Sequence, residues 1–350
     1  MKAMVLAAGV GSRLDPLTSQ LPKPLAPVAN RPVMEHILRL LKSHGFEDVV
    51  SNLHYLPDLI KNYFADGSSL GMNIDFRYEP ELSGDAGGVR ACRNFFGQET
   101  FIVLMGDLLT DADLSRVFAE HKRNGALATI GTKRVDDVSQ FGVVVTDERG
   151  FITGFQEKPA AEEALSDFAS TGIYILEPEI FDYMPKTGSY GFGRQLFPSL
   201  VEKGLPVLSV DLQSYWSDIG TIHQYRQSNF DALEGAVKVQ HFAEQNEHGY
   251  ISPDAKIEGA VSIDGLLMLG RNSRIAPGVR IKGRVVIGDN CRIERNAYLE
   301  DTIVWAKSVV QENASLKNCI VGSGCVVQNG SKHQQVTAVV WPPQTAQVSK

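Results

Sequence analysis

The strongest constraint on the fold of this chain is a six-residue repeat of aliphatic residues in its last third. Ile or Leu occupies every sixth position from Ile251 to Leu299, and Val304, Val310 and Leu316 continue the series after a slip of one residue. A period of six fits neither an α-helix nor an ordinary strand, and it is typical of the hexapeptide repeat of a parallel β-helix. We therefore predict a triangular coil whose aliphatic residues point into the prism.

Glycines fall between the aliphatic positions, where the corners of such a coil need tight turns. They are Gly259, Gly265, Gly270, Gly278, Gly283 and Gly288. We predict a β-helix domain over residues 250–330, followed by an irregular tail over 331–350, where the period is lost. Because a stack of coils cannot bury its terminal coils alone, we expect a homo-oligomer formed through the β-helix.

Residues 1–235 follow a different pattern, in which apolar strand-like runs alternate with helical stripes. This order implies crossover connections and a mostly parallel, Rossmann-like α/β sheet. Strands are predicted at 3–8, 49–53 and 101–105, with helical stripes at 34–41, 59–64 and 114–121. Later runs at 142–146, 151–156 and 171–176 predict an extension of the sheet with hairpin character.

Composition excludes several classes of protein. There are 34 Lys and Arg against 41 Asp and Glu, a net charge of −7 that argues against a nucleic-acid partner. The 4 cysteines include no Cys-x-x-Cys pair, so neither a disulfide framework nor a zinc site is expected. The short apolar stretch near Met4 is far below the roughly 18 residues of a membrane span. We expect a cytoplasmic protein without a membrane partner.

A glycine-rich turn follows the first predicted strand. Gly9 and Gly11 would let backbone N–H groups approach an anion, although the turn is neither a Walker loop nor a good dinucleotide fingerprint. Arg13 and Lys23, the latter between two prolines, form a cationic pair suited to a triphosphate. Two basic residues on a solvated loop would look the same, so the turn alone leaves both interpretations open.

Two aspartates are candidate metal ligands. Asp107 follows the apolar run 101–105, at the strand end where open α/β sheets bind ligands. Asp218 follows an aromatic anchor and precedes a Gly-Thr helix start. Carboxylate oxygens suit Mg²⁺, but each aspartate is equally compatible with a role as a helix or turn cap.

A third group of motifs lies in the sheet extension. Glu157 and Lys158 precede a proline at the end of one predicted strand, and Thr171-Gly-Ile-Tyr174 opens another. A lysine beside a glutamate can hold an anionic group together with hydroxyl groups. A surface charge pair is at least as common before context is considered.

Taken together and in order, these motifs resemble the sugar-1-phosphate nucleotidylyltransferases, also called nucleotide-sugar pyrophosphorylases. The shared pattern is a glycine-rich loop with Arg, Pro-Lys-Pro, Gly-Asp, Glu-Lys-Pro, Thr-Gly-Ile-Tyr and Trp-x-Asp-Ile-Gly. The resemblance covers about residues 1–235, and the added left-handed β-helix is similar to that of mannose-1-phosphate guanylyltransferases and of some glucose-1-phosphate relatives. It implies transfer of a nucleotidyl group from a nucleoside triphosphate to a hexose 1-phosphate, with Mg²⁺ as cofactor and pyrophosphate as product.

The resemblance also implies a role for each matching residue. The residues expected to carry catalysis are Arg13, Lys23, Asp107, Lys158 and Asp218, with Asp107 and Asp218 holding the metal. The expected nucleotide contacts are Leu6, Ala7, Ala8, Gly9, Gly11, Ser12, Arg13, Glu79, Glu81, Gly84, Asp85 and Gly87. The expected sugar-phosphate contacts are Gly142, Glu157, Lys158, Thr171 and Gly172.

The base-recognition segment departs from the family pattern. Guanylyltransferases resemble Leu-Gly-Thr-Ala-Gly here, whereas this chain has Ser-Gly-Asp85-Ala-Gly and lacks the upstream Gln-Pro of pyrimidine enzymes. GTP with mannose 1-phosphate is the predicted pair, because the chain carries the short β-helix and lacks that Gln-Pro. We also expect Glu79, Glu81 or Asp85 to accept hydrogen bonds from guanine. The alternatives are a glucose-1-phosphate uridylyl-, thymidylyl- or adenylyltransferase, a bifunctional uridylyltransferase–acetyltransferase, and an inactive regulatory subunit that senses nucleotide sugars.

Overall fold

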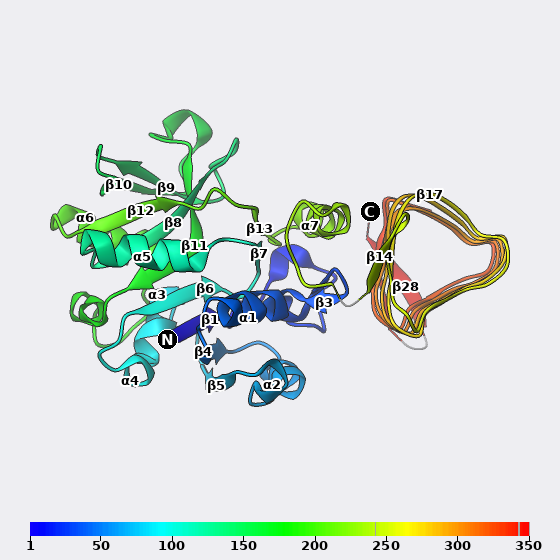
Figure 1. Ribbon diagram of the computed structural model, residues 1–350, viewed down its shortest axis with the longest axis horizontal. Helices are drawn as coiled ribbons and strands as arrows, with labels where there is room; N and C mark the ends of the chain where they lie inside the picture. Colours follow the sequence, from blue (N-terminus) through cyan, green and yellow to red (C-terminus); the bar gives the residue numbers. More distant parts are fainter. Residues whose placement is uncertain (242, 342–343, 350) are drawn as a thin grey trace. The chain divides into compact units, whose positions relative to one another are not determined.

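The computed structural model describes residues 1–241, 243–341 and 344–349, and it divides into two compact units (Figure 1). The first unit comprises residues 1–10 and 37–216, and the second comprises residues 11–36 and 217–350. The domain boundaries predicted from the sequence follow the change in its repeat pattern, whereas the two units are defined by contacts between residues. As a result, the segment 11–36, which carries the predicted phosphate-binding cations, clusters with the C-terminal part of the chain.

A nine-stranded sheet forms the centre of the first unit, in the order β10-β9-β11-β6-β1-β4-β5, with β8 and β12 joined beside β11. Its parallel half consists of β1 (Lys2–Leu6), β4 (Asp48–Leu53), β5 (Asn73–Tyr78) and β6 (Phe101–Met105). The other half contains β8 (Ala128–Arg134), β9 (Gly142–Thr146), β10 (Ile152–Glu157), β11 (Phe168–Leu176) and β12 (Val207–Asp211). The predicted α/β sheet with a hairpin extension is confirmed, since β9 and β10 pair antiparallel.

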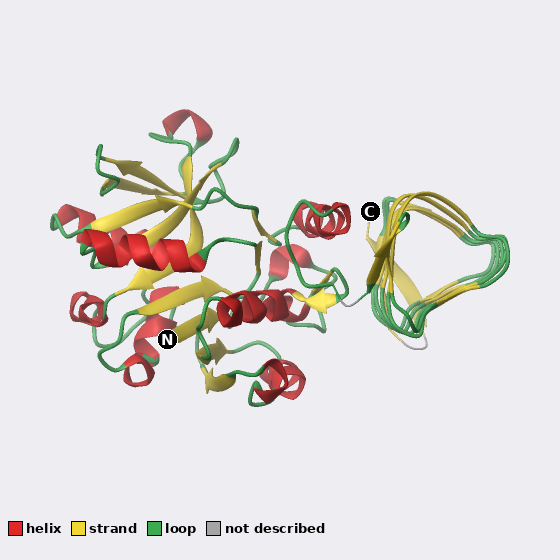
Figure 2. Ribbon diagram, in the orientation of Figure 1, coloured by secondary structure: helices red, strands yellow, loops and turns green. Residues whose placement is uncertain are grey.

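Helices of the first unit lie beside this sheet, as Figure 2 shows. The α-helices before the β-helix are α1 (Val33–Ser43), α2 (Pro57–Phe64), α3 (Asp85–Ala91), α4 (Arg93–Phe96), α5 (Leu114–Asn124), α6 (Phe197–Glu202) and α7 (Ile222–Glu234). Aromatic residues dominate part of the core, where Phe101 stacks on Phe96 with ring centroids 3.8 Å apart. Phe192, which is fully buried, packs against Tyr174 at 4.7 Å and so anchors the π-turn Phe192–Leu196 that precedes α6.

The C-terminal part is a parallel β-helix, as the six-residue period predicted. Ile257, Ile275 and Ile293 pair in register, so one coil takes 18 residues, or three hexads. The inward positions from Ile275 onward are buried, including Leu299, Val304, Val310 and Leu316. Ile257, on the first coil, is 38% exposed because no further coil covers it.

The short strands of the β-helix fall into two sheets. Its longer sheet contains β14 (Glu244–Asn246), β15 (Gly249–Ile251), β17 (Ser262–Leu269), β19 (Arg280–Ile287), β21 (Tyr298–Val304), β23 (Ser315–Lys317), β24 (Ile320–Val321), β26 (Lys332–Gln334), β27 (Thr337–Trp341) and β28 (Gln344–Ser349). The second contains β16 (Lys256–Ile257), β18 (Arg274–Ile275), β20 (Arg292–Ile293), β22 (Val309–Val310) and β25 (Val326–Val327). The segment 331–350 was predicted to be irregular, but β26 and β27 continue the parallel ladders of β23 and β24. These strands form because they pair with the last strands of the β-helix, and such pairing does not require the hexapeptide repeat.

Each corner of the coil places a residue in the left-handed region, where Gly and Asn are tolerated best. One corner column contains Gly265, Gly283, Asp301, Asn318 and Gln335, all with positive φ. Gly270 and Gly288 were predicted to serve turns, but they allow coils to approach closely. A Cβ on either glycine would lie 2.5 Å from the backbone of the next coil.

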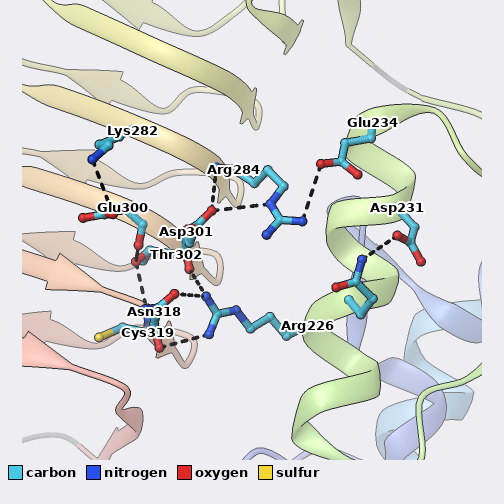
Figure 3. A network of polar contacts seen from close by, with 11 residues as sticks. Arg226, Asp231, Glu234, Lys282, Arg284, Glu300, Asp301, Thr302, Asn318 and Cys319 are labelled. Carbon is cyan, nitrogen blue, oxygen red and sulfur yellow. Dashed lines mark hydrogen bonds and ion pairs between the residues drawn. The ribbon is translucent and has the colours of Figure 1, made fainter.

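The one-residue slip in the repeat lies at Asp301, where one residue opposes both Gly283 and Arg284 of the previous coil. Arg226 of α7 donates to the carbonyl oxygen of Asp301 at 2.8 Å and to Asn318 Oδ1 at 2.5 Å (Figure 3). Arg284 joins Asp301 to Glu234 of α7 through ion pairs of 3.4 and 3.5 Å. The slip therefore forms one of the places where α7 contacts the β-helix.

Candidate active site

The carboxyl ends of β1 and β6 lie side by side in the first unit, because Leu6 pairs with Met105. The Gly106 N–H donates to the Leu6 carbonyl at 2.8 Å, and a Cβ at Gly106 would lie 2.7 Å from that oxygen. The glycine of the Gly-Asp motif is thus required by close approach of two strand ends. It places the half-buried Asp107 where open α/β sheets bind ligands.

A buried hydrogen-bond chain supports the start of the glycine-rich turn after β1, which we call the nucleotide turn because it is predicted to bind the nucleotide. Asn52 accepts from the Ala7 N–H at 3.0 Å and donates to Glu79 Oε1 at 2.7 Å. Glu79 is 5% exposed, and its Oε2 accepts from both the N–H and the hydroxyl of Ser83, at 3.0 and 2.7 Å. Both oxygens of Glu79 therefore accept hydrogen bonds from the protein itself, so Glu79 is a poorer candidate for the predicted guanine acceptor.

Asn52 and Gly88 belong to this arrangement and were not predicted from the sequence. A Cβ at Gly88 would lie 2.6 Å from Asn52 Nδ2 and 2.8 Å from Glu79 Oε1. The available signal was Asn52 itself, an amide in a predicted buried strand, since a polar side chain buried there needs hydrogen-bond partners.

The other expected nucleotide residues of the first unit differ in exposure. Ala7 and Ala8 are buried, whereas Gly9 is exposed with open space where a Cβ would lie. Glu81 is exposed. Asp85 Oδ1 accepts from the N–H groups of Ala86 and Phe192, each at 2.7 Å. Burial raises the pKa of Asp85, although the backbone donors oppose that rise.

The predicted sugar-phosphate pair sits at the end of β10. Gly142 pairs with Glu157 in the β9–β10 ladder, and burial is the largest cause that raises the pKa of Glu157. Lys158 is exposed and has φ 50°, a left-handed conformation that is uncommon for a non-glycine residue and recurs at functional sites. This conformation ends β10 at Glu157 and turns Lys158 out of the strand.

A further residue faces Glu157 and was not predicted. A Cβ at Gly193 would lie 2.1 Å from Glu157 Oε2, so the carboxylate rests against the Gly193 backbone. Gly193 belongs to the π-turn Phe192–Leu196, and such turns are frequent at functional sites. No sequence motif marks this glycine.

Trp216, which opens the Trp-x-Asp motif, contacts the Thr-Gly motif within the first unit. Trp216 Nε1 donates to the Thr171 carbonyl at 2.8 Å, and the Thr171 hydroxyl donates to the Gly131 carbonyl at 2.7 Å. Thr171 is 1% exposed, so its hydroxyl is committed to the fold. Gly172 has φ 77°, and a Cβ there would lie 2.6 Å from Met105 Cγ.

The predicted phosphate-binding cations, Arg13 and Lys23, belong to the second unit. Gly11 has φ 73°, and a Cβ there would lie 2.9 Å from Lys23 Cβ, so the glycine admits the stem of the lysine. Ser12 and Arg13 are exposed, whereas Lys23 is 7% exposed.

The turn after Lys23 is held by α7. Tyr225 donates to the Pro27 carbonyl at 2.6 Å, and Asn229 Oδ1 accepts from the Ala29 N–H at 3.2 Å. Trp305 of the β-helix donates to the Tyr225 hydroxyl at 2.7 Å. A buried polar chain therefore connects the β-helix with the segment that carries Lys23.

Asp218 is half-buried and also lies in the second unit. The alternative role as a helix cap is excluded, because the Thr221 side chain caps α7 by accepting from the Gln224 N–H. A Cβ at Gly220 would lie 2.8 Å from Asp218 Oδ2, so this glycine leaves room for the carboxylate. Among the described residues, no group of three or more His, Cys, Asp or Glu side chains forms a metal site by itself.

Comparisons with known proteins found matches along most of this chain. The model of the nucleotidyl transferase family matches residues 2–235, and that of the GMPPB C-terminal domain matches residues 263–340. A UTP–glucose-1-phosphate uridylyltransferase from Synechocystis is 39% identical and covers 97% of this chain and 92% of the relative. A mannose-1-phosphate guanyltransferase from Schizosaccharomyces pombe is 33% identical and covers 97% and 90%.

A solved structure supports the same fold. A Bacillus anthracis protein described as a glucose-1-phosphate thymidylyltransferase, in complex with sucrose, matches with a TM-score of 0.61 and 26% identity. The match covers 69% of this chain and 96% of the other. No helix in the described part of the chain has the length and apolarity needed to cross a bilayer.

Proposed function

Because this chain belongs to the nucleotidyl transferase family, we propose that it transfers a nucleotidyl group from a nucleoside triphosphate to a hexose 1-phosphate. The products are a nucleoside diphosphate sugar and pyrophosphate. The observation that carries the proposal is the junction of β1 and β6, where the glycine-rich turn and Asp107 leave paired strands at one sheet edge.

The proposed chemistry is an in-line attack by a phosphate oxygen of the hexose 1-phosphate on the α-phosphorus. A bond forms between that oxygen and the α-phosphorus, and the bond to pyrophosphate breaks. Since the nucleophile is already anionic, positioning and charge neutralisation supply the catalysis and no general base is required. In this scheme Arg13 and Lys23 offset triphosphate charge, Lys158 holds the sugar phosphate, and Glu157 accepts sugar hydroxyls.

The carboxylates of Asp107 and Asp218 fit Mg²⁺ by their donor chemistry. Both are hard oxygen donors, and Mg²⁺ is commonly held by one or two carboxylates together with substrate phosphates. The space that Gly220 leaves beside Asp218 is consistent with that role. When bound, the ion would neutralise charge on the reacting phosphates.

Two substrate pairs are candidates. UTP with glucose 1-phosphate is supported by the relative that is 39% identical over 97% of this chain. GTP with mannose 1-phosphate, the pair predicted from the sequence, is supported by the guanyltransferase relative and by the match to the GMPPB C-terminal domain. We favour the uridine pair, because the inward hydrogen bonds of Glu79 remove one of the acceptors on which the guanine argument depended.

The test is a grid of nucleoside triphosphates against hexose and amino-sugar 1-phosphates, with pyrophosphate release as the readout and the Asp107→Asn protein as background. We expect UTP with glucose 1-phosphate to be the best pair. A preference of tenfold or more for GTP with mannose 1-phosphate would reverse the choice. No turnover with any pair would contradict the enzyme proposal and favour a regulatory subunit, and an added acetyl-CoA arm tests the bifunctional alternative.

A further inference from the structure

Asp85 is the residue at which the base-recognition segment departs from the family pattern, and its carboxylate is directed to the protein. Its Oδ1 accepts from the Phe192 N–H at 2.7 Å, across 107 residues of sequence, as well as from the adjacent Ala86 N–H. Two backbone donors therefore occupy the lone pairs of Oδ1, the oxygen of the carboxylate that faces the protein.

Two backbone hydrogen bonds reinforce this contact. The Tyr190 N–H donates to the Ser83 carbonyl at 2.8 Å, and the Gly87 N–H donates to the Tyr190 carbonyl at 2.9 Å. A Cβ at Gly84 would lie 2.4 Å from the Tyr190 oxygen, so only glycine allows this approach. We call the paired segments Ser83–Gly87 and Tyr190–Phe192 the clasp.

The residue that follows the clasp in sequence contacts Glu157, whose carboxylate is predicted to bind the hexose. Gly193 follows the clasp in sequence, and Glu157 Oε2 would lie 2.1 Å from a Cβ on that glycine. The charge of Asp85 also acts on Glu157, whose pKa it raises after the larger effect of burial. At its other end, Ser83 binds Glu79, which holds Asn52 and through it the Ala7 N–H of the nucleotide turn.

We propose that Asp85 is a positioning residue that fastens the base-recognition segment to the hexose-recognition segment through the Phe192 N–H. It sets the place of Gly193 and hence the rest position of Glu157. This inference rests on the proposed function, because it assigns Glu157 to the hexose. The Asp85 side chain accordingly acts on sugar binding, and the nucleobase is recognised by other groups.

The test compares Asp85→Ala with Asp85→Asn at one fixed pH. Asn keeps an oxygen that can accept from the Phe192 N–H, whereas Ala leaves that donor unpaired. Loss of a hydrogen bond to a charged group is expected to raise the KM for hexose 1-phosphate about tenfold in Asp85→Ala. The KM for the nucleotide and the order of preference among bases should stay unchanged, and Asp85→Asn should restore the hexose KM.

Asp113→Ala is the matched control. Asp113 Oδ1 also accepts a backbone N–H, from Arg116 at 2.9 Å, but it caps α5 and is not part of the predicted site. Its removal should change neither KM. If Asp85→Ala instead raises the nucleotide KM or alters base preference while the hexose KM is unchanged, Asp85 faces the base and the proposal is wrong.

Hydrogen–deuterium exchange of the segment around Phe192 provides a readout that does not depend on turnover. Exchange there should be faster in Asp85→Ala and unchanged in Asp85→Asn. Equal exchange in wild type and Asp85→Ala would overturn the clasp even if the enzyme is active. If the wild type shows no turnover but exchange around Phe192 is faster in Asp85→Ala, the proposed function is wrong and the hydrogen bond between Asp85 and Phe192 still stands.

Discussion

The hydroxyl of Tyr225 connects the β-helix to the turn that follows Lys23, and its removal should destabilise the second unit. Tyr225 is fully buried, donates to the Pro27 carbonyl at 2.6 Å and accepts from Trp305 Nε1 at 2.7 Å. Tyr225→Phe removes the hydrogen-bond partner of the buried Trp305 Nε1 and of the partly buried Pro27 carbonyl, although Asn229 Nδ2 remains 3.4 Å from the Pro27 oxygen. Each unsatisfied group costs about 1–3 kcal/mol, and the Pro27 carbonyl costs less because Asn229 remains near it. We therefore expect the free energy of unfolding to fall by about 2–4 kcal/mol.

The assay is urea unfolding followed by far-UV circular dichroism, analysed by linear extrapolation. Trp305→Phe in the Tyr225→Phe background removes the orphaned donor, so the double variant should be less destabilised than the sum by at least about 0.5 kcal/mol. Tyr298→Phe is the control, because its hydroxyl bonds Glu300 at 2.7 Å on a half-buried face of the β-helix. A Tyr225→Phe loss no larger than that of the control, or strict additivity, would refute the reasoning.

Three further outcomes follow from the same structure. Asp107→Asn and Asp218→Asn should each reduce pyrophosphate release by orders of magnitude with an unchanged circular dichroism spectrum, and near-normal turnover with Mg²⁺ would contradict their roles. Burial, with the nearby charge of His36, lowers the pKa of His241 from 6.5 to about 4, so the unfolded state binds more protons between these values. The free energy of unfolding should therefore fall as the pH drops from 6.5 to 4, and His241→Gln should flatten its dependence on pH over that range. If wild type and variant show the same pH dependence in urea unfolding, His241 is not the group responsible. Ile257, 38% exposed on the first coil, should contribute to assembly, so Ile257→Asp should lower the oligomeric mass measured by light scattering, and an equal mass would argue against this surface.

Local periodicity explains what the sequence predicted well. The six-residue repeat specified the inward column of the β-helix because each coil repeats the same contact with the next. The predicted strand 101–105 coincides with β6, since a continuous apolar run of that length fits a strand buried on both faces. Even the slip after Leu299 was visible, and the structure places it at the corner residue Asp301.

Contacts between distant segments explain what the sequence did not predict. The bond between Asp85 and Phe192 spans 107 residues, and no local pattern around either residue indicates the other. The clustering of residues 11–36 with the C-terminal part depends on α7 and on Trp305, which lie far along the chain. Glu79 was predicted from its charge and neighbourhood, but charge alone does not tell whether a carboxylate faces a ligand or the protein's own donors.

Two glycines of one segment offer a sharp test of how Glu157 is positioned. A Cβ at Gly193 would lie 2.1 Å from Glu157 Oε2, whereas a Cβ at Gly191 would lie 3.5 Å from Asp85 Oδ1, an ordinary contact. Because the obstructed atom is the end of a flexible side chain, Gly193→Ala should displace the carboxylate and leave the fold intact. We expect a higher KM for hexose 1-phosphate in Gly193→Ala, an unchanged KM in Gly191→Ala, and equal melting temperatures within about 2 °C. If both variants bind the sugar phosphate as the wild type does, the position of Glu157 against Gly193 does not govern hexose binding.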